Sequence, residues 1–154
     1  MVSSKVLVPS GVLGLGFDIK ALQLGMLKKP DIISIDGGST DSGPASLGSG
    51  TSKYSRAAIK SEWKILMQAR SEANIPLIIG SCGTCGTNAM VDWMEEITHE
   101  LSKELGQSLK ITKLYCDQEK EFIKRKFKSK KIYPLDPAPE LNLKIIDEMS
   151  NIVA

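Results

Sequence analysis

The sequence predicts an α/β domain of the three-layer, Rossmann-like class, with a mostly parallel sheet covered by helices on both faces. Short apolar runs, such as residues 31–35 (DIISI) and 75–79 (IPLII), alternate with amphipathic stretches of helical length. Both runs are apolar nearly throughout, as buried parallel strands are. Strands that alternate with helices pair in parallel through right-handed crossovers. A chain of 154 residues is the size of one domain, so we expect residues 1–154 to form a single unit.

The same pattern assigns the remaining elements. Further strands are expected at residues 5–8, 109–115 and 131–135. Helices are expected at residues 18–28, 55–74, 89–105, 119–127 and 141–152. Asp18 is a candidate N-cap and Gly106 a candidate left-handed C-cap. The stretch 36–53 has no periodicity, and a loop of that length inside a domain is uncommon unless it binds something or is disordered.

The charge, the apolar runs and the cysteine count exclude several classes of function. The formal charge of +2 does not call for a nucleic acid or an anionic membrane as partner, and no apolar run has the length of a membrane span. The first residues do not resemble a signal peptide. The three cysteines, Cys82, Cys85 and Cys116, are too few and odd in number for a disulfide framework. We therefore expect a cytoplasmic protein with no membrane or nucleic-acid partner.

Ligands of open α/β sheets bind beyond the carboxyl ends of the strands. In this chain those ends carry loops of glycine and small polar residues, namely 9–11 (PSG), 36–41 (DGGSTD), 80–86 (GSCGTCG) and 116–117 (CD). If the sheet is parallel, the four loops share one edge. The sequence therefore predicts a small-molecule site at that edge, to which Ser10 of the first loop contributes.

The DGGSTD loop suits an anionic ligand. Gly37 and Gly38 let backbone N–H groups turn toward an anion, and Ser39 and Thr40 add hydroxyl donors. The two acids of the loop, Asp36 and Asp41, are the candidate catalytic residues, because a carboxylate there could accept a proton, hold a metal or bind a substrate hydroxyl. Alternatively, the aspartates only cap backbone amides. Function is favoured for the loop as a whole, and the choice stays open for Asp41.

The GSCGTCGT loop contains a C-x-x-C just before a helix. Helix N-terminal amides would favour a thiolate, so a thioredoxin-like redox pair is one interpretation and half of a zinc site is another. The favoured interpretation is a close-packed, anion-binding turn of small residues. Its candidate binding residues are Ser81, Cys82, Gly83, Thr84, Cys85 and Gly86. No metal site is expected, and no cofactor can be specified.

Other chemistries have little support. His99 lies among charged residues of an expected helix and is interpreted as solvated, which leaves a nucleophile–histidine apparatus without a base. The basic stretch 120–131 is interpreted as a charged helix face, with Phe122 and Phe127 directed to the core. The sequence has no dinucleotide G-x-G-x-x-G, no P-loop and no G-x-S-x-G elbow.

Four strings of this chain resemble the N-terminal region of the acyclic terpene utilisation protein A family. They are KVLVPSGVLGLGFD from residue 5, IDGGSTDSGP from 35, LGSGTSKYSR from 47 and PLIIGSCGTCGTNAMVDW from 76. The resemblance covers the whole chain and implies the N-terminal part of a longer architecture. It also implies a metabolic role on an organic acid or acyl-CoA thioester, with only the two loops as a transferable site.

Three functions compete at this point. The first is a domain or subunit of an enzyme that acts on an organic acid or acyl-CoA, its anion held at the strand edge. The second is a non-catalytic binding or assembly domain that needs a second subunit or a further C-terminal region. The third is a C-x-x-C redox protein.

Overall fold

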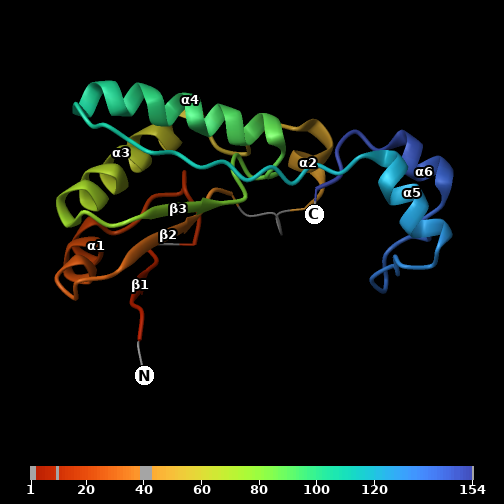
Figure 1. Ribbon diagram of the computed structural model, residues 1–154, viewed down its shortest axis with the longest axis horizontal. Helices are drawn as coiled ribbons and strands as arrows, with labels where there is room; N and C mark the ends of the chain where they lie inside the picture. Colours follow the sequence, from red (N-terminus) through yellow and green to blue (C-terminus); the bar gives the residue numbers. More distant parts are fainter. Residues whose placement is uncertain (1–2, 10, 39–42, 154) are drawn as a thin grey trace.

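The computed structural model of the chain describes residues 3–9, 11–38 and 43–153. Three parallel strands, β1 (Val6–Leu7), β2 (Ile32–Asp36) and β3 (Leu77–Gly80), form one sheet in the order β1-β2-β3 (Figure 1). The mixed α/β class and the parallel pairing are confirmed.

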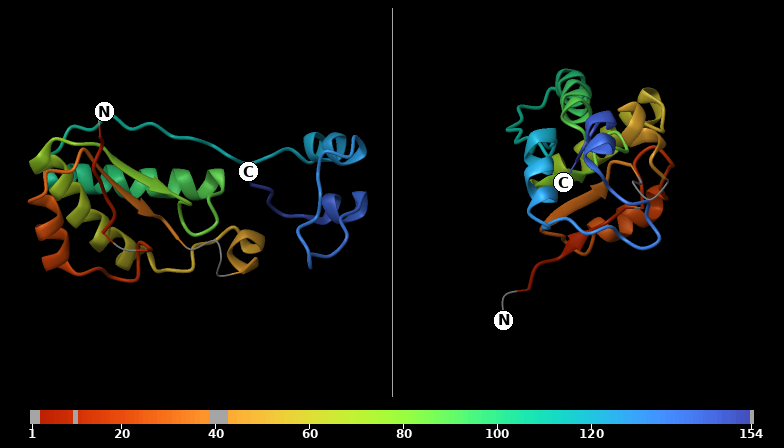
Figure 2. Two further views of the ribbon diagram at one scale, coloured as in Figure 1. Left: turned by 90° about the horizontal axis from the view of Figure 1, so that it is seen from below. Right: turned by 90° about the vertical axis from the view of Figure 1, so that its right-hand side faces the viewer.

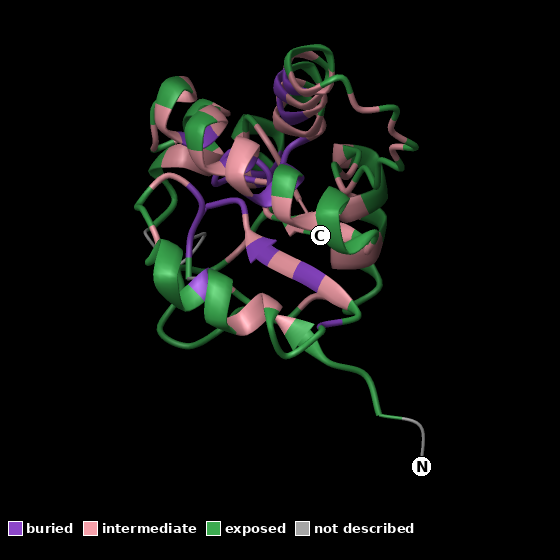
Figure 3. Cartoon of the chain, turned by 90° about the vertical axis from the view of Figure 1, so that its left-hand side faces the viewer, coloured by how far each residue is buried: buried purple, intermediate pink, exposed green. Residues whose placement is uncertain are grey.

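One face of this sheet carries the core. Helices α1 (Ile19–Met26), α3 (Arg56–Ala73) and α4 (Asn88–Leu105) lie over it (Figure 2). The core joins Ile33 and Ile35 of β2 to buried side chains of these helices. On the other face, Val6 is 57% exposed and Ile78 51%, so the described residues form two layers (Figure 3). In the described part of the chain the expected helices on the second face are not seen. Right-handed crossovers between strands in sequential order place α1 and α3 on the same side, and α4 packs beside α3.

The helix termini follow their sequence signals. The Asp18 carboxylate accepts from the backbone N–H groups of Lys20 and Ala21, as an N-cap does. The side chains of Ser55 and Thr87 cap α3 and α4 in the same way. Gly106 ends α4 in the left-handed conformation, as expected.

Two strand predictions are wrong. Residues 109–115 and 131–135 contain no strand. The first segment is extended and runs alongside β3 without joining the sheet (Figure 1). A short helix, α2 (Ala45–Ser49), lies inside the stretch expected to be a loop. Its five residues include Gly48 and are too few to show helical periodicity.

The last two helices form a separate lobe. Helices α5 (Lys120–Lys128) and α6 (Leu143–Glu148) pack against each other, away from the sheet (Figure 2). The chain returns from this lobe through an antiparallel bridge between Asp117 and Val153. The last helix is shorter than expected, because the backbone becomes extended at Met149. Among the described residues, no helix combines the length and apolarity needed to cross a membrane.

Candidate functional site

The carboxyl ends of β2 and β3 lie next to each other. Asp36 pairs with Gly80 in the parallel register, so the loops that follow these two residues leave the same edge of the sheet. The backbone N–H of Leu13 donates to the Asp36 carbonyl at 2.8 Å, which brings the loop after β1 to this edge as well. The expected clustering of these loops is confirmed.

Residues 116–117 also lie at this edge of the sheet, although no fourth strand precedes them. The Asn88 N–H, in the first turn of α4, donates to the Asp117 carboxylate at 3.0 Å. The Asn88 side-chain oxygen accepts from the N–H groups of Cys116 and Asp117, both at 3.2 Å. Three hydrogen bonds therefore hold this segment at the N-terminus of α4, directly after the turn formed by residues 81–86.

The two glycines of the first loop allow backbone to pack on backbone. The Gly37 N–H donates to the Gly80 carbonyl at 2.6 Å, and the Thr84 N–H donates to the Gly37 carbonyl at 3.3 Å. A Cβ atom on Gly38 would lie 2.2 Å from the Thr84 Cα atom and 2.4 Å from its nitrogen. Glycine is thus required at position 38 because the two loops touch there.

The carboxylate of Asp36 lies within this junction. One of its oxygens, Oδ1, accepts from the Gly38 N–H at 2.9 Å, an Asx-type turn that fixes the start of the loop. The structure thus shows a local capping bond for Asp36. The other expected residues of these loops, Ser10, Ser39, Thr40 and Asp41, lie outside the described residues.

The 81–86 turn is tightly wound. Ser81, Gly83, Thr84 and Gly86 all have left-handed backbone, with φ of 47°, 59°, 73° and 66°. This conformation is a genuine outlier for β-branched threonine. It persists here because the Thr84 hydroxyl, in a residue only 1% exposed, accepts from the Lys53 N–H at 3.1 Å. The expected close-packed turn is therefore present, and its geometry is fixed from several sides.

The two cysteines of the turn face different cavities. Cys85 lines a small pocket together with Thr84, whereas Cys82 lines a larger groove beside β3. Both are buried free thiols. Burial raises the pKa of the Cys82 thiol from 9.0 to about 11, so it is protonated at neutral pH. No group of three or more potential metal-ligating side chains occurs in the described parts of the chain.

The small pocket occupies about 540 Å³. It lies between α2, the 81–86 turn and the end of the chain, and is lined by Gly43, Pro44, Ser46, Leu47, Thr84, Cys85 and Val153. Its volume is in the range of small-molecule sites. The walls are mainly apolar, with a serine and a threonine as polar contacts, and the N-terminus of α4 lies close by. The pocket therefore suits a small, mainly apolar molecule with a few polar atoms.

Two of these residues were not among the predicted site residues. Leu47 lies on the unexpected helix α2, and Val153 follows the last helix. They line the same pocket because the Asn151 amide donates to the Leu47 carbonyl at 2.6 Å, across 104 residues of sequence. Neither spacing nor composition reveals a contact between such distant positions.

The charged residues outside this edge hold elements together. Glu100 of α4 accepts from Arg56 at 2.7 Å and from Lys60 at 2.9 Å, both on α3. The hydrogen bond from Arg56 is the largest cause that lowers the pKa of Glu100 to about 2. The imidazole of His99 is 60% exposed, in agreement with a solvated residue.

The basic helix α5 differs in part from expectation. Phe122 is 37% exposed rather than directed into a core. The Lys126 ammonium lies 5.1 Å from the centre of its ring and the Arg125 guanidinium 5.8 Å, so the ring is covered by the cations of its own helix. Phe127 is half-buried, and α5 contains no fully buried residue.

No family model matches this chain, and no curated protein or solved structure is significantly similar to it.

Substitution of Cys82 is expected to reduce the loss of stability at alkaline pH. Between pH 9.0 and about 11 the unfolded chain releases the Cys82 proton while the folded chain keeps it. The folded state then binds more protons, so the free energy of unfolding falls by about 2–3 kcal/mol as pH rises across this window. Urea unfolding of wild type and Cys82→Ser at both ends of the window measures the difference. Cys116→Ser is the control, and equal pH slopes for wild type and Cys82→Ser would contradict the prediction.

Proposed function

We propose that this chain is a domain or subunit of a cytoplasmic metabolic enzyme that acts on an organic acid or acyl-CoA thioester. The observation that carries the proposal is the small pocket at the carboxyl ends of the strands, next to the first turn of α4. Ligands of parallel α/β sheets bind in this position. The strings that resemble the acyclic terpene utilisation protein A family include the loops at this edge.

Within this proposal the ligand is divided between two environments. Its carboxylate or phosphate lies toward the hydroxyl groups of Ser46 and Thr84. Its apolar part lies against Leu47 and Val153. Asp36 and Asp41 remain the proposed proton-transfer residues.

The non-catalytic alternative is supported by a different observation. The uncovered sheet face exposes Val6 and Ile78, and apolar side chains on such a face are typical of a surface that another element covers. A second subunit or a further C-terminal region would supply that layer and complete the three-layer arrangement. The redox alternative loses support, because Cys82 and Cys85 face separate cavities and burial opposes ionisation of Cys82.

Calorimetric titration with short branched carboxylates and their coenzyme A thioesters tests the proposal. Leu47→Trp places an indole at the pocket wall and is expected to weaken binding at least tenfold, because ligand and indole compete for the same volume. Leu24→Trp, on the exposed side of α1, is the matched control and is expected to bind like wild type. No binding to wild type, or equal binding to the Leu47→Trp protein, would refute the proposal.

Asp36→Asn separates the chemical role of Asp36 from its capping role. Asparagine keeps an oxygen that accepts from Gly38, so the melting temperature is expected to move little while ligand affinity or turnover falls. Asp36→Ala also removes the cap and is expected to cost about 1 kcal/mol of stability. Full affinity and turnover in Asp36→Asn, measured together with any partner chain, would leave Asp36 with the structural role alone.

A further inference from the structure

The outer edge of β3 carries backbone groups without partners. On the inner edge, the carbonyls of Pro76 and Gly80 accept from Ile33 and Gly37 of the β2 side, at 3.1 and 2.6 Å. Backbone groups alternate in direction along a strand, so Leu77 and Ile79 direct their N–H and C=O groups away from β2. Within the described residues, no backbone or side-chain group pairs with these four. They form the wall of the larger groove.

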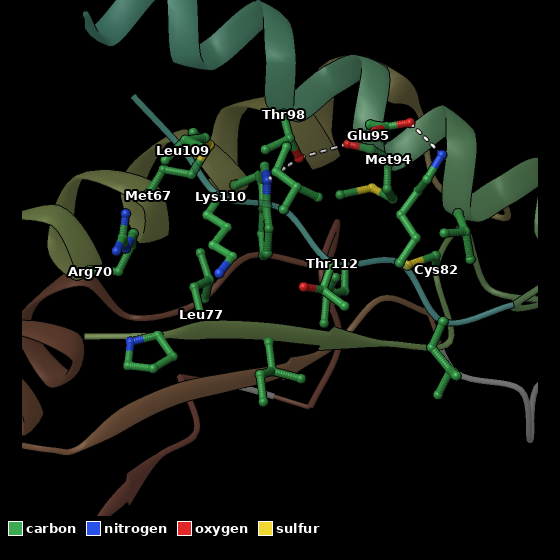
Figure 4. Close-up of a pocket in the computed structure, with 18 of the residues that line it drawn as sticks. Met67, Arg70, Leu77, Cys82, Met94, Glu95, Thr98, Leu109, Lys110 and Thr112 are labelled. Atoms are coloured by element: carbon green, nitrogen blue, oxygen red, sulfur yellow. Dashed lines mark hydrogen bonds and ion pairs between the residues drawn. The ribbon is translucent and has the colours of Figure 1, made fainter. Parts of the chain in front are cut away.

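The opposite wall is a second extended segment. Residues 108–114 run alongside β3 but do not pair with it (Figure 4). Paired strands lie about 5 Å apart, whereas a groove of about 750 Å³ separates these two stretches. The segment has no hydrogen bond to another part of the backbone within the described chain. The groove therefore lies between two extended walls, each with backbone groups available for pairing.

The roof of the groove is apolar, and its polar groups form hydrogen bonds with one another. Met67 of α3 and Met94 of α4 line it, together with the indole of Trp63. The Trp63 N–H donates to the Thr98 hydroxyl at 2.9 Å, and that hydroxyl donates to the Met94 carbonyl at 2.7 Å. The polar atoms of the roof are thus occupied, and it presents mainly a surface for apolar side chains.

The charged residues that line the groove are Arg70, Glu95, Lys110 and Lys113. Lys110 reaches from the outer wall toward Leu77, and Arg70 lies at the same end (Figure 4). Arg70 donates through Nε to the Ile75 carbonyl at 3.0 Å, and no acidic side chain pairs with Lys110 among the described residues. Lys113 differs, because it is bound to Asp92 at 2.9 Å and Glu95 at 2.7 Å. The groove therefore has an uncompensated positive end.

We propose that this groove binds an extended peptide segment of a partner protein, which adds a strand to β3. The outward amides and carbonyls of Leu77 and Ile79 supply the backbone pairing, as in other cases of strand addition. Alternate side chains of the peptide contact the apolar roof, and acidic side chains on its other face meet Lys110. A hydrocarbon chain fits the proposal less well, because it would leave the four edge groups without partners.

The experiment uses an acetylated, amidated hexapeptide of alternating valine and glutamate, labelled for fluorescence anisotropy. Ile79→Pro removes one outward N–H while the ladder to β2 stays intact, and is expected to weaken binding about tenfold. Lys110→Glu is expected to weaken it about fivefold. Lys128→Glu, exposed on α5, is the charge-matched control and is expected to leave binding unchanged.

A second arm does not depend on the folding of any variant. The same hexapeptide with its valine amides N-methylated keeps every side chain but loses backbone donors, and it is expected not to bind. Binding of the methylated peptide, or of laurate in its place with equal affinity for wild type and Ile79→Pro, would overturn the proposal. So would slow hydrogen exchange at the Leu77 and Ile79 amides of the free protein, since residues 109–115 would then already occupy the edge.

Discussion

Gly38→Ala is expected to lower the free energy of unfolding by about 3 kcal/mol and to abolish ligand binding at the small pocket. The added Cβ would lie 2.2 Å from the Thr84 Cα atom and 2.5 Å from its hydroxyl oxygen. Backbone atoms cannot rotate aside as a flexible side chain can. The two loops must therefore separate, which breaks the bond between Thr84 and Gly37 and displaces one wall of the pocket.

The control for this substitution is Gly48→Ala. A Cβ at Gly48 meets no atom within 4 Å, and the position lies inside α2, where alanine is favoured over glycine by about 1 kcal/mol. Urea unfolding of both variants measures the contrast. If Gly38→Ala proves as stable as wild type and retains affinity, the packing of these two loops does not form the site.

Trp63→Ala is expected to cost about 4 kcal/mol of stability. The indole is only 5% exposed, belongs to the main core between α3 and the sheet, and also lines the groove beside β3. Its removal leaves a cavity that the surrounding helices cannot fill, and it leaves the Thr98 hydroxyl without its indole donor. The effect is read from the midpoint of urea unfolding at unchanged slope.

Trp63→Phe separates packing from hydrogen bonding. Phenylalanine keeps an aromatic ring in the core but has no N–H for Thr98, so a cost of about 1–2 kcal/mol is expected. A loss in Trp63→Ala no larger than that in Trp63→Phe would show that the ring contributes little through packing.

The parts of the fold that follow local rules were predictable. The runs around Ile33 and Ile79 are apolar enough to be recognised as strands, and Asp18 and Gly106 mark helix ends by their own chemistry. The strand prediction for residues 109–115 is wrong for a nonlocal reason. Its sequence, LKITKLY, is compatible with a strand, but a strand exists only where a neighbouring edge pairs with it.

The candidate site was likewise predictable only in part. The glycines of the first loop predict that its backbone packs closely on another segment. The structure shows this at Gly38, whose backbone packs against that of Thr84. The cysteine spacing suggests a pair, yet the turn between Cys82 and Cys85 directs them to different cavities. C-x-x-C fixes the separation along the chain but not the direction of each thiol, which depends on the left-handed residues between them.

The bond between Asn151 and Leu47 has a consequence for how the pocket assembles. It closes a loop of 104 residues, and the entropic cost of such closure grows only with the logarithm of loop length. The pocket still cannot form before the rest of the chain has brought Val153 back to α2. A molecule held between these two residues is bound only by the fully closed chain, so by mass action it stabilises the docking of the α5–α6 lobe along with its own site.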